Sequence, residues 1–189
     1  MRKGWFIIPG VQDGIVTLAD QMIALWSAVA ECKGKTVLDL GCAEGLIGRE
    51  FARAGARSVV GLDSISEHLQ VAREQCAGLP MTFLLANLNE PRVVYPADIV
   101  LCLNVAHKLR DPAVAIRFAA DSATDLLLLR SGRASDARGI IKGKHFGITC
   151  DSRAILRERG FVLERAADGP MDRPEPVEYW RRPSATATS

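Results

Sequence analysis

Glycines and acids are closely spaced early in the chain, and they are residue types that can hold a nucleotide-like ligand. One stretch runs Val37-Leu-Asp39-Leu-Gly41-Cys-Ala-Glu-Gly45, and a second apolar run ends in Asp63. Glycines let the backbone pass close to a ligand, because a Cβ there would collide with the ligand or forbid the turn. A carboxylate at a strand end can accept both hydroxyl hydrogens of a ribose. The pattern predicts a strand, a tight turn, a helix and a second strand that together cradle a nucleotide-type cofactor.

The glycine spacing indicates which cofactor this is. Dinucleotide-binding dehydrogenases use Gly-x-Gly-x-x-Gly, with a helix start aimed at a pyrophosphate. Here the spacing is Asp39-x-Gly41-x-x-x-Gly45, and the middle glycine of the dinucleotide pattern would fall at Ala43. With Asp63 at the end of the next strand, the arrangement resembles motif I of the class I S-adenosylmethionine-dependent methyltransferases. The resemblance covers roughly half of the chain.

The resemblance implies a role for each loop at the strand ends. Asp39 would bind the ammonium group of S-adenosylmethionine through water, and Asp63 would hold the ribose diol. Asn87 stands where the family usually carries an aspartate that meets the adenine amino group; an amide oxygen can accept the same bond, and a plain turn residue is the alternative. The remaining positions expected to contact the cofactor are Gly41, Cys42, Ala43, Glu44, Gly45, Ser64, Leu88, Asn104 and Val105.

Two histidines are candidate general bases, because an imidazole titrates near pH ~6.5. His107 follows the fourth expected strand, and a role as a hydrogen-bonding residue at the entry to the next helix is equally open. His145 lies in the basic, glycine-rich stretch 130–145 after the fifth strand. We expect that stretch to be a substrate lid that captures an anionic group, with a solvated loop as the alternative. A base is needed only if the acceptor must lose a proton during attack.

Strands and helices alternate along the chain, which predicts an α/β fold with a single Rossmann-like doubly wound sheet. The sheet should be mostly parallel, with helices on both faces and an antiparallel final strand pair. Strands are expected at 36–40, 59–63, 81–85, 97–103, 125–129, 161–166 and 177–181. Helices are expected at 18–33, 46–54, 64–77, 112–121 and 153–159, after an irregular lead-in at 1–16. Ser64 to Glu67 resemble an N-terminal cap of the helix expected at 64–77.

Size and composition favour one domain, since the chain has 189 residues, 48% of them hydrophobic, and a net charge of +2. We expect a methyltransferase domain at 1–182, with a lead-in and helix at 1–35, and a disordered tail at 183–189. The five cysteines form no Cys-x-x-Cys pair, so free thiols and no metal site are expected. No run approaches the ~20 apolar residues of a membrane span, and we expect a cytoplasmic protein of undetermined oligomeric state.

The resemblance implies a methyltransferase that moves a methyl group from S-adenosylmethionine to a small or anionic acceptor. An RNA-modifying methyltransferase and a binding or scaffold protein without turnover are the alternatives. A short-chain dehydrogenase would need a Tyr-x-x-x-Lys pair, but Tyr95 and Tyr179 are followed four residues later by Ile99 and Pro183. Aromatic residues for base stacking are sparse in the basic stretch, which disfavours single-stranded RNA.

Overall fold

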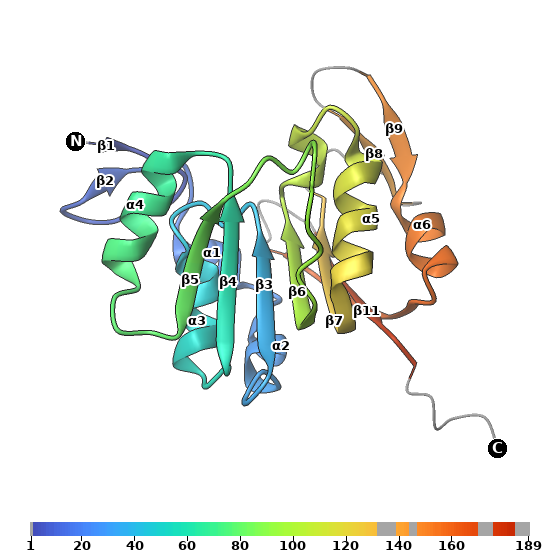
Figure 1. Cartoon of the computed structure of the whole chain (residues 1–189), viewed down its shortest axis with the longest axis horizontal. Coiled ribbons are helices and arrows are strands. Elements are labelled where there is room, and N and C mark those ends of the chain that lie inside the picture. The colour runs from blue at the N-terminus through green and yellow to red at the C-terminus, as the bar shows by residue number, and fades with distance from the viewer. Residues whose placement is uncertain (1, 132–138, 144–146, 170–175, 184–189) are drawn as a thin grey trace.

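A seven-stranded sheet forms the centre of the protein (Figure 1). The computed structural model describes residues 2–131, 139–143, 147–169 and 176–183. The strands of the sheet are β3 (Thr36–Leu40), β4 (Ser58–Asp63), β5 (Met81–Leu85), β6 (Ala97–Leu103), β7 (Ala123–Arg130), β10 (Val162–Ala167) and β11 (Val177–Arg181). Their order across the sheet is β10-β11-β7-β6-β3-β4-β5.

Five of these strands are parallel neighbours, and β11 runs opposite to the other six. β3 pairs with β4 on one side and with β6 on the other, both in parallel. β11 pairs antiparallel with β7 and with β10. The chain therefore builds outward from β3 in one direction through β4 and β5, and then in the other through β6 and β7. Ligands of such sheets bind beyond the carboxyl ends of the strands at this switch point.

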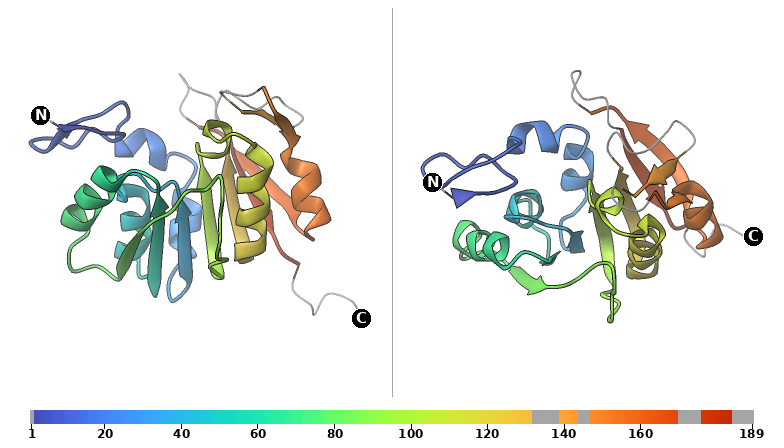
Figure 2. Two further views of the ribbon diagram at one scale, coloured as in Figure 1. Left: turned by 45° about the horizontal axis from the view of Figure 1, so that its top comes forward. Right: turned by 90° about the horizontal axis from the view of Figure 1, so that it is seen from above.

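Helices cover both faces of the sheet, as Figure 2 shows. α1 to α4 lie over one face, and α5 and α6 lie over the other. The helices are α1 (Leu18–Met22), α2 (Trp26–Ala30), α3 (Leu46–Arg53), α4 (Ser66–Gln75), α5 (Pro112–Ser122) and α6 (Ser152–Glu158), with a 3-10 turn η1 (Ala106–Lys108). The Rossmann-like doubly wound sheet that the alternation predicted is confirmed.

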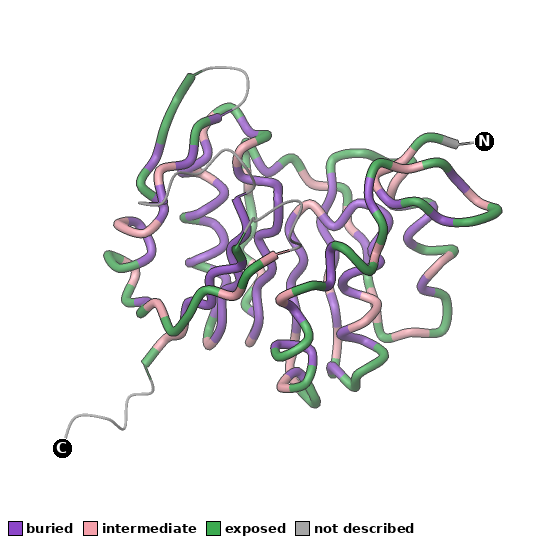
Figure 3. Tube along the Cα trace, turned by 180° about the vertical axis from the view of Figure 1, so that it is seen from behind, coloured by how far each residue is buried: buried purple, intermediate pink, exposed green. Residues whose placement is uncertain are grey.

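Successive side chains of the central strands feed two separate apolar clusters. On β6, Ile99 and Leu101 join the cluster under α1–α3, whereas Val100 and Cys102 join the cluster under α5 and α6. This alternation is the period of two that a strand imposes. The central strands are consequently buried along their whole length (Figure 3), which is why they read in the sequence as continuous apolar runs.

The single helix expected at 18–33 is two short helices, so that prediction was wrong. α1 ends at Met22, and Ala24 has a left-handed backbone with φ of +69°. The buried guanidinium of Arg130 donates to the backbone oxygens of Gln21 (3.1 Å) and Ile23 (2.8 Å). Because Arg130 satisfies these terminal carbonyls, the chain does not need another helical turn there. The lead-in is also not irregular throughout, since β1 (Arg2–Lys3) pairs in parallel with β2 (Gln12–Asp13).

The stretch expected to be a basic lid contains a strand. β8 (Ile140–Lys142) pairs antiparallel with β9 (Thr149–Asp151), so those positions are not loop. Arg130, where the stretch begins, is only 1% exposed and belongs to the core. Residues 132–138 and 144–146, which include His145, lie outside the described residues, as does the expected tail from 184 onward. In the part of the chain that the structure describes, none of the helices has the length and apolarity to cross a membrane.

Two glycines with left-handed backbones provide a matched test of the packing beneath the glycine turn. A Cβ added at Gly45 (φ of +72°) would lie 2.7 Å from Cε1 of Phe83, whereas one added at Gly78 (φ of +81°) would meet no heavy atom within 4 Å. Gly78→Ala should cost about 1–2 kcal/mol of unfolding free energy from backbone strain alone. Gly45→Ala should cost about 1–3 kcal/mol more from overpacking. Urea unfolding measures both, and equal losses would show that the Phe83 ring moves aside freely.

Candidate functional site

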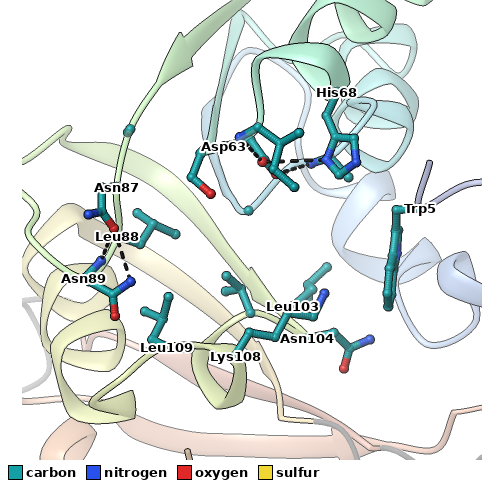
Figure 4. Close-up of a pocket in the computed structure, with 16 residues that line it drawn as sticks. Trp5, Asp63, His68, Asn87, Leu88, Asn89, Leu103, Asn104, Lys108 and Leu109 are labelled. Atoms are coloured by element: carbon teal, nitrogen blue, oxygen red, sulfur yellow. Dashed lines mark hydrogen bonds and ion pairs between the residues drawn. The ribbon is translucent and has the colours of Figure 1, made fainter. Parts of the chain in front are cut away.

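A cavity of about 240 Å³ lies beyond the carboxyl ends of β3, β4, β5 and β6 (Figure 4). Most of the positions expected to contact a cofactor line it. They are Gly41, Ala43, Asp63, Ser64, Asn87, Leu88, Asn104 and Val105. The expected positions that are not among the lining residues are Asp39, Cys42, Glu44, Gly45 and His107. The cavity therefore combines the glycine turn with three further strand ends at the switch point.

The glycine turn forms the floor of the cavity. Gly41 has φ of +69°, and its N–H and that of Cys42 both donate to the Leu62 carbonyl on β4. A Cβ at Gly41 would lie 2.7 Å from Cγ2 of Val105, so only glycine fits between the two strand ends. Ala43 also has a left-handed backbone, with φ of +47°, which is uncommon for a residue with a Cβ.

Asp63 ends β4 and holds the glycine turn in place. Its Oδ2 accepts from the Ala43 N–H (2.8 Å), and its Oδ1 accepts from the Ile65 N–H (2.9 Å). Burial alone would raise the pKa of the Asp63 carboxyl, but His68 and these two N–H groups together keep it below its ordinary value. Asp63 is thus an anion that faces the cavity with each oxygen still able to accept one more bond. α4 has no side-chain cap at its N-cap residue Ile65, so the expected cap at Ser64 was wrong.

Asp39 lies beneath the same turn and is 4% exposed. Its Oδ2 is buried without a hydrogen-bond partner among the described residues. Burial raises the pKa of the Asp39 carboxyl to about 7, and the negative charge of Asp63 adds to the rise. A buried acid with an unpartnered oxygen is costly, and a bound cation would relieve that cost.

Glu44 points away from the cavity and toward the start of the chain. It is fully buried, and its two carboxylate oxygens accept the backbone N–H groups of Trp5 (2.8 Å) and Phe6 (3.0 Å). Glu44 thereby anchors the N-terminal segment, residues 4–8, to the glycine turn. The expected contact between Glu44 and a cofactor stays a prediction, and both of its carboxylate oxygens already accept backbone N–H groups.

The β5 and β6 ends supply polar and apolar walls. The side-chain oxygen Oδ1 of Asn87 accepts both the N–H and the Nδ2–H of Asn89, so Asn87 does act as a turn residue. Asn104 has φ of +56°, and its Nδ2 donates to Oε1 of the buried Gln21 on α1 (3.3 Å). Leu88 is buried beside them. Asn104 therefore links the carboxyl end of β6 to α1.

The reactive groups named in the sequence are less prominent in the site. His107 lies in η1 outside the lining, and His145 lies outside the described residues. Cys42 is buried, and burial is the main cause that raises the pKa of its thiol far above the ordinary range, so the thiol is inert. All five cysteines are free and buried, which confirms the expected free thiols.

The lining residues that the sequence analysis did not name include Trp5, His68 and Lys108. The Lys108 Nζ lies 3.8 Å from the centroid of the Trp5 ring, a cation–π distance. His68 lies in the first turn of α4, just after Asp63, and that position was a signal available in the sequence. No local sequence pattern predicts that Trp5 lies in the site, because contacts with distant residues, Glu44 and Lys108, place it there.

The comparisons with known proteins agree with this geometry. Residues 37–123 match the methyltransferase domain family. The ubiquinone biosynthesis O-methyltransferase of Proteus mirabilis (strain HI4320) is 36% identical over 88 residues, which are 44% of this chain and 36% of that protein. The protein of the same name from Photorhabdus laumondii is 40% identical over 83 residues, 42% of this chain and 34% of that protein. The match thus spans about a third of the length of these curated relatives.

Solved structures resemble the chain over most of its length. Magnesium protoporphyrin IX methyltransferase from Synechocystis PCC 6803 with bound SAH has a TM-score of 0.69 at 22% identity, covering 90% of both chains. The cyclase SpnF has a TM-score of 0.65 at 17% identity, covering 88% of this chain and 82% of that one. Residues 37–123 accordingly match a methyltransferase domain, and the chain has the Rossmann-like fold of S-adenosylmethionine-dependent methyltransferases.

Proposed function

We propose that the protein binds S-adenosylmethionine in this cavity and transfers its methyl group to a small, anionic acceptor. One observation carries the proposal: two acids at neighbouring strand ends can each accept a further hydrogen bond. Asp39 has a buried oxygen without a donor, and Asp63 faces the cavity with spare acceptor capacity. A ligand that carries both an ammonium group and a ribose diol would satisfy both acids at once.

The other lining residues suit the remaining parts of that cofactor. Leu88 and Val105 offer apolar walls, as a planar base requires. The close approach at Gly41 leaves backbone exposed to the methionine half. When bound, the cofactor supplies a methyl group activated by its sulfonium. The residues of the chain then orient the acceptor against it and exclude water.

The mouth of the cavity favours an anionic acceptor. Lys108 and Trp5 meet there, and a cation in a cleft raises the local concentration of anions. A phenolate or carboxylate acceptor is already a nucleophile and needs no protein base. This fits a site in which His107 does not line the cavity and His68 is held between two carboxylates. The curated relatives are named as O-methyltransferases, which supports an oxygen acceptor.

The alternatives have less support. Among the described lining residues Trp5 and His68 are the aromatic rings, and His68 lies between two carboxylates, whereas single-stranded RNA binding combines several stacking platforms with a basic groove. A binding protein without turnover stays open, because the similar structure of SpnF carries the name of a cyclase. Transfer of a labelled methyl group would separate an enzyme from such a binding protein.

The first test is calorimetry with S-adenosylhomocysteine and NADP. The wild type should bind S-adenosylhomocysteine and show no heat with NADP. Asp63→Asn should weaken that binding at least about tenfold, because hydrogen bonds to a charged acceptor contribute ~1.5–3 kcal/mol. Asp98→Asn is the matched control, since Asp98 accepts from the N–H and Oγ1 of Thr36 at the amino ends of β3 and β6, away from the cavity. Tight NADP binding without S-adenosylhomocysteine binding would contradict the proposed function.

The buried Asp39 carboxylate should lower the stability of the folded protein at neutral pH and raise its affinity for S-adenosylhomocysteine. With a folded-state pKa of about 7 against an ordinary 3.8, the folded protein keeps a proton that the unfolded chain has lost between those values. Stability therefore falls as pH rises through this window and levels off above it. Asp39→Asn removes this effect, so its gain in Tm over the wild type should be larger at about pH 8 than at about pH 5. Its affinity for S-adenosylhomocysteine should fall, and a variant that binds as tightly as the wild type would exclude Asp39 from the site.

Lys108 should act on the acceptor more than on the cofactor. Lys108→Met should raise the KM for carboxylate and phenol acceptors severalfold, with a smaller effect at high salt because screening shortens the reach of exposed charges. Lys33→Met makes the same charge change in the exposed turn before β3 and should leave KM unchanged. Labelled methyl transfer measures both. A Lys108→Met variant that loses S-adenosylhomocysteine affinity but keeps KM would assign Lys108 to the cofactor half.

A further inference from the structure

His68 lies between two buried carboxylates from different elements. Its Nδ1 is 3.7 Å from Oδ1 of Asp63 at the end of β4, and its Nε2 is 3.7 Å from Oε1 of Glu44 in the glycine turn. The side chain is 18% exposed and lines the cavity (Figure 4). Both separations are ion-pair distances and longer than hydrogen bonds, so the imidazole interacts with both acids through its charge.

Each of the two acids already holds a separate piece of backbone. Asp63 fixes the glycine turn through the Ala43 N–H, and Glu44 fixes the N-terminal segment through the Trp5 N–H. The packing around Glu44 is close, because a Cβ at Gly4 would lie 2.3 Å from Oε1 of Glu44. His68 is therefore the one described side chain that ion-pairs with both acids.

We propose that His68 is a positioning residue: as an imidazolium it orients Asp63 toward the cofactor ribose and, through Glu44, couples that orientation to the docking of the N-terminal segment. The inference rests on the proposed function, because it takes Asp63 as the ribose acceptor. It adds that the cofactor binds more tightly to the protonated than to the neutral state of His68. It also adds that a ribose bound to Asp63 stabilises the docked N-terminal segment, which contains Trp5.

The charges around the imidazole favour its protonated form. Asp63 is the main cause that raises the pKa of His68, burial opposes the rise, and Glu44 adds to it. Lys108 in η1 opposes it from across the cavity, and Glu67 faces it from its own helix. The ion-paired form is thus complete at low pH and is lost as pH rises through the raised pKa. Deprotonation leaves two buried like charges without a cation between them.

Adenosine is the probe that isolates this effect. It has the ribose diol and the adenine but no amino acid group, so it cannot engage Asp39. Calorimetry should show that the wild type binds adenosine at least about fivefold more tightly at about pH 6 than at about pH 8.5. His68→Gln keeps a polar side chain without the charge, and its affinity should depend much less on pH than that of the wild type and match the wild type at the higher pH. An unchanged affinity and pH dependence in His68→Gln would overturn the proposal.

Two further measurements keep the inference testable if His68→Gln folds poorly. In the wild type, nuclear magnetic resonance titration should show that adenosine raises the pKa of the His68 imidazole, since binding and protonation favour each other. An unchanged or lowered pKa would contradict the coupling. Hydrogen exchange should show that adenosine protects the Trp5 and Phe6 amides in the wild type and not in Glu44→Gln. Failure of the wild type to bind adenosine or S-adenosylhomocysteine would instead refute the proposed function itself.

Discussion

The hydrogen bond from the Ala43 N–H to Asp63 determines the geometry of the rest of the site. It joins the turn after β3 to the end of β4 at 2.8 Å, and it holds Ala43 in a left-handed conformation that a residue with a Cβ rarely adopts. With the turn fixed, Gly41 presses against Val105 and Glu44 projects toward the start of the chain. The Asp63 carboxylate therefore fixes the turn that forms the floor of the cavity, and it faces the interior of that cavity. By fixing the turn, it also directs Glu44 toward the start of the chain.

Negative charge is the constraint that this arrangement creates. Asp39, Glu44 and Asp63 are all buried at neighbouring strand ends, where the low dielectric makes unbalanced charge costly. The protein balances two of these acids with backbone N–H groups and His68. Asp39 lacks such a partner at its buried Oδ2 among the described residues, and burial raises the pKa of its carboxyl to about 7.

The sequence predicted the parts of this protein that local patterns encode. Apolar runs located the strands, because parallel strands buried on both faces have no polar side, and the glycine spacing with Asp63 located the cradle. Long-range contacts were not predictable in this way. The break at Ala24 depends on Arg130, more than a hundred residues later, whose guanidinium replaces a helical turn. Likewise, the bond from the Trp5 N–H to Glu44 helps to place Trp5 in the site, and no local sequence pattern predicts that bond.

The link between Glu44 and the N-terminal segment also sets an order of events during folding. The segment precedes Glu44 in the chain, but its anchor, the buried Glu44 carboxylate, is in place only once β3 and β4 have paired around the glycine turn. Its own β1–β2 pairing is two residues long and is too short to be stable alone. The segment therefore docks only after this part of the sheet has formed, and its apolar residues Ile7 and Ile15 stay exposed in the folded protein.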